Sequence, residues 1–521
     1  MVPGFPTKMI ATLAMAFAPS LLPAPNGPWN EGEKPGVFVE QVQQEQGGSY
    51  LALRVEGLDF TPWKAVAGPG GELYLAGTAR VSERGSTRRG FGVLKLDADG
   101  RPAEGFGRKL GGRKIGLAFV PVLDDLEPGA LVGACLQPSA KAGREKLVLV
   151  ANAELTETSG ACMVLARVAL RDGKPKRLAG KMTLAIGFGE GLEGRSFARG
   201  LFASENGITV VGDRDGNPAF LRLDPGDGEL DSGFGAPVEP GEDGSRSGKL
   251  VIPIDRFANL TYAFTTAVDT FTCQPAGDIF AVGHVIDEDL ENKAFQTLFW
   301  VTADGRPMPG FGIDKAHGGA TTLYYELPGS GKVPVELSMH SVLHIDAPEG
   351  KQPPTLFVGL GSFRTPGRPP LCALNLWRLV PATDGLSGRR SWTLESQIFS
   401  VDAHEIDPAQ TGLRPQALLK QRDGELLVVV SDEQGRMLAS HHDVRHEYDP
   451  AEVRDFSPWY DGRIRDDLLH GVPPSQEATR VLFALQVDGE KEYLVLARIA
   501  AGQPTILRRF DTATGDPDVG W

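Results

Sequence analysis

The sequence predicts an all-β protein, a seven-bladed β-propeller of four-stranded blades. Three observations lead to this prediction. Glycine and proline supply 65 and 39 of the 521 residues, too many for a helical bundle, because both destabilise a helix interior. Short runs rich in β-branched and aromatic residues, bounded by turn residues, recur along the chain. A corner motif recurs with a fixed internal spacing, which is typical of a repeat architecture.

The N-terminal segment has the pattern of an export signal. Lys8 precedes an apolar stretch over residues 9–18, which fits a secretory signal and is too short to cross a bilayer. We expect a signal peptide over residues 1–24 and a linker over 25–47, where proline, glycine, glutamine and glutamate are frequent. The protein is therefore expected outside the cytoplasm, in the periplasm or secreted, with no transmembrane segment.

Each expected blade begins with two recognisable strands, called a and b. The strand b runs are compact and rich in Val, Leu and Ile, and six of the seven close on Gly or Ala. They span 72–77, 146–151, 207–212, 278–283, 355–359, 425–430 and 492–497. Strand a lies just upstream of each, at 63–67, 131–136, 198–203, 268–273, 341–345, 417–421 and 481–485.

A corner follows the third strand, c, in the clearest units. It combines an Asp-Gly turn, in which glycine supplies a positive φ, with an aromatic residue that packs inward between glycines. The aromatic residue stands seven positions after the Asp in three copies, and the chain ends on the same frame. The repeat residues are Asp99, Gly100 and Phe106, then Asp227, Gly228 and Phe234, then Asp304, Gly305 and Phe311, and finally Trp521.

The two ends of the repeat region complement each other. The last unit stops at Trp521 without a fourth strand, d, whereas residues 49–55 precede the first strand a. We expect this N-terminal segment to complete the last blade and close the ring, which would remove an exposed sheet edge. The propeller would then span residues 48–521, with an insertion at about 450–478. A pair of β-sandwiches is the alternative fold.

The corner motif resembles that of the bacterial delta-60 repeat proteins. The stretch from Asp227 to Gly235, with Asp231 in its middle, matches that family's tail most closely, whereas the other two copies carry Ala103 and Met308 at the middle position. The resemblance implies a propeller-like repeat in exported or surface-associated bacterial proteins. It implies no catalytic residues, because the signature is structural.

Composition also restricts the partners. The net charge of −14 and a pI near 5.3 argue against nucleic acid or an anionic membrane, which need a basic surface. A protein or a cell-surface polymer is the expected partner, and the oligomeric state is open. The four cysteines form no C-x-x-C pair for zinc or redox chemistry. Free thiols are expected, with a Cys135–Cys162 disulfide as the alternative.

The candidate binding residues lie on one rim of the expected propeller. Loops between strands b and c all reach that rim, and loops on a rigid scaffold commonly carry binding sites. The insertion adds two aromatic residues suited to a glycan or protein contact, although they can also fold back as a plug. The candidates are Arg84, Arg88, Asp213, Asp215, His284, Asp287, Trp459 and Tyr460.

No catalytic motif is present, so no catalytic residue, metal or other cofactor is predicted. Residues 213–217 resemble the start of a calcium loop, but position 224 carries Asp where the bidentate glutamate would stand, and an Asp-Gly hairpin is favoured. His442 and His446 would stand about 13 Å apart on a strand, which favours a polar strand over a metal site. The expected function is non-enzymatic binding. The alternative is a hydrolase- or lactonase-type propeller with a metal at the channel mouth.

Overall fold

A computed structural model gives the fold of the chain. It describes residues 36–521 with gaps at 44–48, 57–58, 84–85, 108, 111–112, 123–125, 142, 156–159, 193, 238–245, 254–262, 275–276, 288–292, 312–319, 323–324, 328–330, 334–335, 346–354, 365–370, 384–389, 401–412, 433–434, 444–458, 461–467, 470–478, 501–502 and 519–520. Every named element in these residues is a strand. The described residues contain no helix long and apolar enough to span a membrane.

Seven sheets of the described residues have four or five strands, and we number them in chain order. Sheet 1 contains β3 (Asp59–Ala67), β4 (Leu73–Glu83), β5 (Ser86–Leu96) and β8 (Leu117–Pro121). Sheet 2 contains β9 (Leu126–Gln137), β10 (Lys146–Leu155), β11 (Ala161–Ala169), β12 (Pro175–Lys176) and β13 (Thr183–Ile186). Sheet 3 contains β14 (Ser196–Ala203), β15 (Ile208–Arg214), β16 (Asn217–Leu223) and β17 (Lys249–Val251).

The later sheets repeat the same antiparallel order. Sheet 4 contains β18 (Ala263–Cys273), β19 (Ile279–Asp287), β20 (Lys293–Val301) and β21 (Ala320–Thr322). Sheet 5 contains β24 (Glu336–Ile345), β25 (Thr355–Arg364), β26 (Leu371–Thr383) and β27 (Arg390–Ser400). Sheet 6 contains β28 (Arg414–Lys420), β29 (Leu426–Ser431), β30 (Met437–Asp443) and β31 (Trp459–Tyr460).

Sheet 7 combines the two ends of the described chain. It contains β32 (Thr479–Asp488), β33 (Lys491–Ala500) and β34 (Thr505–Asp511), followed by β2 (Ser49–Glu56) and β1 (Gly36–Gln43). Strand β2 pairs with β34 in the register Leu51 opposite Leu507. Two small ribbons, β6 (Lys109–Leu110) with β7 (Arg113–Lys114) and β22 (Tyr325–Leu327) with β23 (Gly331–Val333), lie outside the seven sheets.

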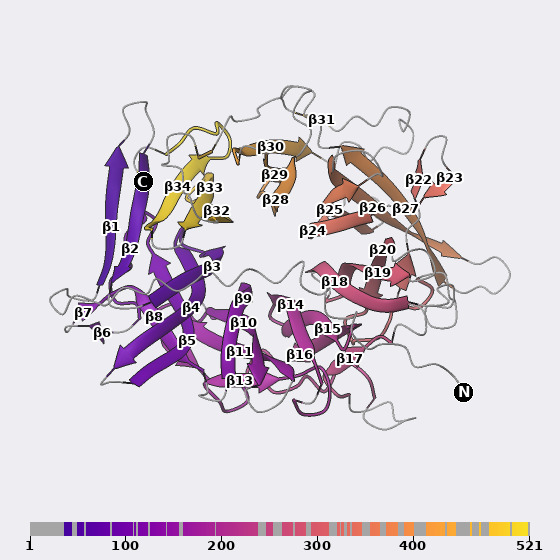
Figure 1. Ribbon diagram of the computed structural model, residues 1–521, viewed down its shortest axis with the longest axis horizontal. Helices are drawn as coiled ribbons and strands as arrows, with labels where there is room; N and C mark the ends of the chain where they lie inside the picture. The colour runs from indigo at the N-terminus through magenta and orange to yellow at the C-terminus, as the bar shows by residue number, and fades with distance from the viewer. Residues whose placement is uncertain are drawn as a thin grey trace, which may run out of the picture.

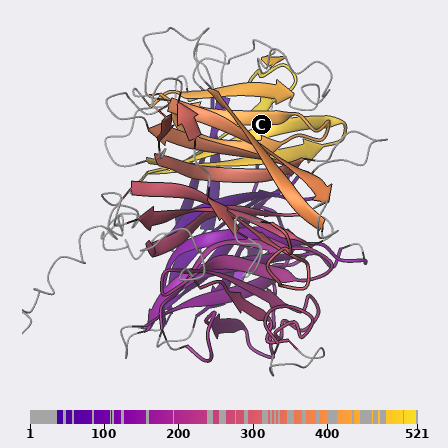
Figure 2. The ribbon, with the colours of Figure 1, turned by 90° about the vertical axis from the view of Figure 1, so that its right-hand side faces the viewer.

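The sheets are arranged as the blades of a β-propeller. Figure 1 shows the first strand of each sheet nearest the middle, from β3 through β9, β14, β18, β24 and β28 to β32. Figure 2 shows the sheets from the side, stacked one above another. The all-β fold and the four-stranded blade are therefore confirmed. Each predicted strand b run begins within one residue of the start of an observed strand, and each predicted strand a lies in or next to the first strand of a sheet.

The core lies between the sheets. Alternate residues of a strand point to opposite faces, so Leu149 of β10 packs toward sheet 1 and Val150 packs toward sheet 3. A separate apolar cluster joins each consecutive pair of sheets from 1 to 7. Another cluster joins sheet 7 to sheet 1 and includes Leu51, Leu75 and Leu507.

The predicted corners are confirmed in shape. In the second corner the predicted Asp227 accepts the backbone N–H of Glu229 at 2.8 Å, whereas in the first corner a different residue makes the turn's hydrogen bonds. Gly100, Gly228 and Gly305 have φ values of 75°, 80° and 75°. The carboxylate that accepts the backbone N–H groups of the first turn belongs to Asp97, two residues before Asp99, with a distance of 2.8 Å to the nitrogen of Arg101. The corner aromatics Phe106, Phe234, Phe311 and Trp521 are all buried.

Two segments expected to be loops contain strands. Residues 36–43 fall in the expected linker but form β1, because Val37, Val39 and the apolar residues of β2 alternate with polar ones and pack in the same core. Trp459 and Tyr460 fall in the expected insertion but pair with Asp443 and His442 as the fourth strand of sheet 6. None of the four cysteines forms a disulfide.

Candidate functional site

The structure separates the predicted rim residues. Arg84 lies outside the described residues, as do the side chains of Asp287, Trp459 and Tyr460, whose backbones lie in β19 and β31. Arg88 is exposed on β5, opposite Val81. Asp213 and His284 come together near the channel, whereas Asp215 does not join them.

The inner strands share a local irregularity that the sequence reading missed. In six of the seven sheets the first strand carries an extra residue at a corresponding place, where its pairing with the second strand shifts register. Strands β9 and β18 each have a second register shift nearer their N-terminal end. Such a β-bulge bends the strand and re-aims a side chain. In sheet 7, β32 pairs with β33 without a shift. The bulge residues are Trp63, Val132, Arg199, Asp269, His340 and Gln416.

Four of these bulge residues make the same kind of side-chain contact. In each sheet, the residue before the bulge pairs with a residue of the second strand, for example Pro62 with Gly77. The bulge side chain contacts the next residue of that second strand, here Thr78. The contacts are Trp63 Nε1 to Thr78 Oγ1 at 3.2 Å, Arg199 Nε to Asp213 Oδ2 at 2.9 Å, Asp269 Oδ1 to His284 Nδ1 at 3.0 Å and Gln416 Nε2 to Ser431 Oγ at 2.9 Å. The repeat therefore places a polar pair at the same position in sheets 1, 3, 4 and 6.

In sheet 2 the bulge residue is the apolar Val132, which has no polar group to offer. Asn152, the residue of β10 at the corresponding position, forms its hydrogen bonds with sheet 3 instead. The Asn152 side chain accepts a hydrogen bond from the backbone nitrogen of Ala198 at 2.7 Å. Its amide group donates to the carbonyl of the same residue at 3.1 Å. This exchange links sheets 2 and 3 at the level of the polar pairs.

The pairs of sheets 3 and 4 form one charge cluster. Burial raises the pKa of Asp213, and Arg199 offsets this only in part. Burial lowers the pKa of His284, but the hydrogen bond and charge of Asp269 outweigh it, so the pKa is raised overall, and Asp213 adds to the rise. The second oxygen of Asp269, Oδ2, is buried and has no hydrogen-bond partner in the described part of the chain. An imidazole held by a carboxylate is suited to binding a polar group or moving a proton.

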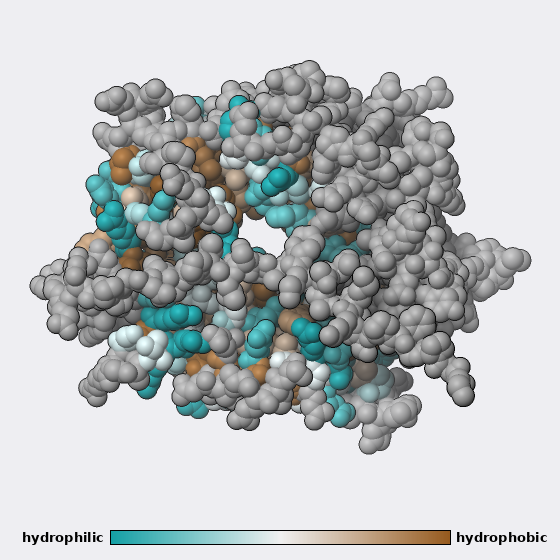
Figure 3. Space-filling model, in the orientation of Figure 1, coloured by the Kyte–Doolittle hydropathy of each residue, from teal (hydrophilic) through white to brown (hydrophobic). Residues whose placement is uncertain are grey.

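A basic cluster lies elsewhere on the inner strands. The guanidinium of Arg480 stacks on the ring of Trp63 at 3.4 Å from its centre and donates to the carbonyl of Pro62 at 3.2 Å. Lys64 and His340 are exposed, yet desolvation lowers the pKa of each, and the charge of Lys64 lowers that of His340 further. Sheets 1 and 5 are not neighbours, so the charge of Lys64 acts on His340 from across the channel, whose opening Figure 3 shows.

Residues 213–217 do not gather oxygens at one point. Asp215 has a positive φ of 49°, and its Oδ1 accepts the backbone N–H of Arg195 at 2.9 Å, away from Asp213. The described residues contain no group of three or more His, Cys, Asp or Glu side chains placed to hold a metal ion. The prediction that no cofactor is bound stays a prediction.

The histidines of β30 also have separate surroundings. His441 Nδ1 lies 2.8 Å from Gln421 Oε1, whereas His442 Nε2 lies 2.9 Å from Ser440 Oγ. Burial, with a smaller contribution from His441, lowers the pKa of His442 to about 4. His446 lies outside the described residues. This geometry is that of a polar strand.

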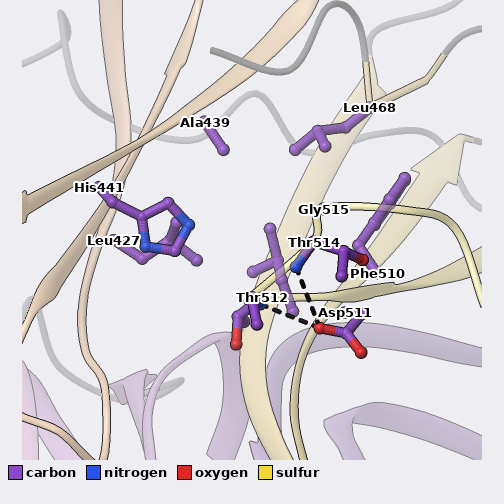
Figure 4. Close-up of a pocket in the computed structure, with 11 residues that line it drawn as sticks. Leu427, Ala439, His441, Leu468, Phe510, Asp511, Thr512, Thr514 and Gly515 are labelled. Atoms are coloured by element: carbon purple, nitrogen blue, oxygen red, sulfur yellow. Dashed lines mark hydrogen bonds between the residues drawn. The ribbon is translucent and has the colours of Figure 1, made fainter. Parts of the chain in front are cut away.

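A small cavity of about 30 Å³ lies between sheets 6 and 7, away from the polar pairs (Figure 4). Leu427, Leu468 and Phe510 supply apolar walls, and His441 faces it from β30. Asp511 is engaged in the corner, where its Oδ1 accepts the N–H groups of residues 513 and 514 at 2.9 and 3.2 Å. The cavity suits a water-sized occupant rather than a substrate.

Known proteins give no family for this chain. No known protein family and no curated protein matches the chain. A β-propeller domain of the Trilobed protease from Pyrococcus furiosus, described as having an open velcro topology, is similar with 10% identity, a TM-score of 0.37, and coverage of 88% of this chain and 96% of that one. An unknown function protein from Dyadobacter fermentans is similar with 12% identity, a TM-score of 0.36, and coverage of 87% and 94%. The propeller assignment rests on the strand pairing, and the delta-60 resemblance stays a prediction.

Proposed function

We propose that this chain is an exported bacterial binding or scaffold propeller that contacts a protein or cell-surface polymer at its channel mouth and carries out no catalysis. One observation carries this proposal. The bulges of sheets 3 and 4 bring Arg199, Asp213, Asp269 and His284 from two blades to one place. Cation, carboxylate and imidazole groups side by side provide donors and acceptors for a polar ligand.

We also propose that the ring has seven blades, with β2 as the fourth strand of the last one. The pairing of Leu51 with Leu507 supports this, as does the apolar cluster shared by sheets 7 and 1. A closed ring would hold the inner strands at fixed separations. Fixed separations matter for binding, because a preorganised site loses less entropy when its ligand binds.

The second candidate is a hydrolase- or lactonase-type enzyme at the same mouth. The contact between His284 and Asp269 favours it, because a carboxylate-oriented imidazole is a common general base. A nucleophile or a metal-bound water would also be needed. Metal analysis of the purified protein, together with ester and lactone hydrolysis assays, tests this candidate. A metal held by three or more protein ligands in the channel, with turnover, would overturn the binding proposal.

The binding proposal is tested by co-sedimentation of the full chain with purified peptidoglycan, the acidic polysaccharide alginate and neutral dextran beads. We expect saturable retention on at least one cell-surface polymer, and weaker retention for the double variant Arg199→Ala with Asp269→Asn. The exposed Lys174→Ala variant is the control, because its side chain is 71% exposed and bonds only to its neighbour Asp172. Equal retention of all three proteins would contradict a channel-mouth site.

A further inference from the structure

Among the residues that the structure describes, the basic cluster of Lys64, Arg480 and His340 has no acidic partner. The three factors that shift its pKa values are burial, the effect of Arg480 on Lys64 and the effect of Lys64 on His340, and all of them lower the values. None of the three side chains makes an ion pair within the described residues. Holding like charges together in a partly desolvated space is unfavourable, so the cluster lacks a compensating negative group.

Arg480 is the member of the cluster with a stacking contact and a hydrogen bond to neighbouring residues. The indole of Trp63 is itself fixed by its hydrogen bond to Thr78, and it supports the guanidinium from one side. A guanidinium has five N–H donors, and one bond, to the carbonyl of Pro62, is made within the described residues. Burial lowers the pKa of Arg480 to about 10, which leaves it charged at neutral pH. The remaining donors are available to a ligand.

Lys64 and His340 both stand at register shifts of their inner strands. Lys64 directly follows the bulge residue Trp63, and His340 is the bulge residue of sheet 5. Both side chains are exposed. Because they interact across the ring, a group bound between them would touch two opposite blades.

The basic cluster differs from Arg199, the other cation described on an inner strand. Arg199 is a bulge residue like His340, but its charge is compensated by Asp213 at 2.9 Å. The whole chain is acidic, with 67 Asp and Glu against 53 Lys and Arg, so an uncompensated basic group in the channel is a local exception. A guanidinium fork beside an ammonium group matches the oxygens of a carboxylate or phosphate.

We propose that Lys64, Arg480 and His340 form a binding site for an oxyanion, a carboxylate or phosphate group, inside the channel. This inference rests on the proposed binding function and names the chemistry of its ligand. The oxyanion can be a free small ion or an acidic group of a cell-surface polymer. The mixed cluster of sheets 3 and 4 would then contact other polar groups of the same ligand.

The test is calorimetric titration of the full chain with sodium phosphate and with citrate at constant ionic strength, beside alginate co-sedimentation. We expect saturable binding of at least one anion, about tenfold weaker in Lys64→Met, the loss expected for one charge-assisted hydrogen bond. Lys174→Met is the charge-matched control and should bind as the unmodified chain does. His340→Gln is a second variant, because removal of Arg480 would also disturb packing between blades.

The outcomes separate the inference from the proposed function. Anion binding weakened by Lys64→Met and His340→Gln, with no alginate retention, supports a small-anion site and contradicts the polymer as ligand. Retention weakened by the same variants supports an acidic polymer as the source. Polymer retention that neither variant changes, or the absence of saturable anion binding and of retention, overturns the oxyanion site. Equal weakening by Lys174→Met would show a general charge effect and would also overturn it.

Discussion

The indole of Trp521 donates a hydrogen bond of 2.7 Å to the carbonyl of Ala98, 423 residues earlier in the chain. Arg509 donates to the same carbonyl at 2.8 Å. The hydrogen bond of Arg509 has equivalents between other blades. Arg167 donates to the carbonyl of Pro225 at 3.0 Å, and Arg222 donates to the carbonyl of Ala303. A strand c arginine of one blade thus holds the corner turn of the next, and the join between sheets 7 and 1 uses the same contact.

Replacement of Trp521 with Ala should destabilise the whole propeller. The side chain is buried in the cluster between sheets 7 and 1, so we expect a loss of about 3–5 kcal/mol in the free energy of unfolding. Urea unfolding followed by tryptophan fluorescence and circular dichroism measures it. Trp521→Phe keeps most of the packing and should lose about 1 kcal/mol. An unchanged midpoint for Trp521→Ala would contradict a structural role for this contact.

Residues 48–56 should be needed for the stability of every blade. Their deletion removes β2 from its pairing with β34, so we expect a lower melting temperature for the whole chain. Leu51→Ala is the point variant, with an expected loss of about 2–5 kcal/mol. The control is Phe38→Ala on the neighbouring β1, where the side chain is 49% exposed and little change is expected. A deletion that leaves the melting temperature unchanged would refute closure by β2.

Two turn glycines, Gly305 in a corner and Gly435 between β29 and β30, differ in what a side chain would meet. A Cβ at Gly305 would stand 2.2 Å from the backbone nitrogen of Gly235, whereas one at Gly435 would meet nothing within 4 Å. Both have a positive φ, 75° and 78°, so Gly435→Ala should cost about 1–2 kcal/mol from backbone strain alone. We expect Gly305→Ala to cost clearly more in thermal unfolding. Equal losses would show that the close approach of the two blades is relaxed.

His284 should titrate above the usual histidine range because of Asp269. In Asp269→Asn the hydrogen bond loses its charge, so the pKa of His284 should fall, as measured by NMR titration of the ring. The sign of the stability effect follows from linkage. A histidine pKa raised in the folded state contributes stability below the unfolded value of about 6.5, and this contribution disappears as pH rises through the folded value. A pKa of His284 unchanged by Asp269→Asn would contradict the pairing.

The sequence was sufficient to locate the framework of the blades. The runs at 72–77 and 207–212 became β4 and β15 because compact apolar runs between turn residues are a local signal. The corner at Gly228 was visible for the same reason, since a turn needs only neighbouring residues. Trp459 and Tyr460 were missed as a strand because a two-residue strand has no periodicity to detect.

The channel site could be predicted only in part. His284 and Asp213 were candidates, but as loop residues rather than as partners of a bulge. A bulge adds one residue without changing composition, so nothing local marks Asp269 or Arg199 as its centre. One signal was available: a polar residue directly after the residue that closes strand b, as at Thr78. The effect of the Lys64 charge on His340 acts between sheets that are not neighbours and leaves no mark in either strand.

The bulges separate the chemistry of the channel from the stability of the fold. Residues such as Gln416 and Arg199 stand outside the regular pairing of their strands, and four of the six bulge residues belong to none of the interblade clusters. Trp63 and Val132 are the exceptions, because both pack against a cluster. The other four can therefore change by mutation with little cost to the cores on either side. Gene duplication of a blade would supply a new inner position, and later point mutations would diversify it. Variation at such positions offers a combinatorial route to new ligand specificities on an unchanged scaffold.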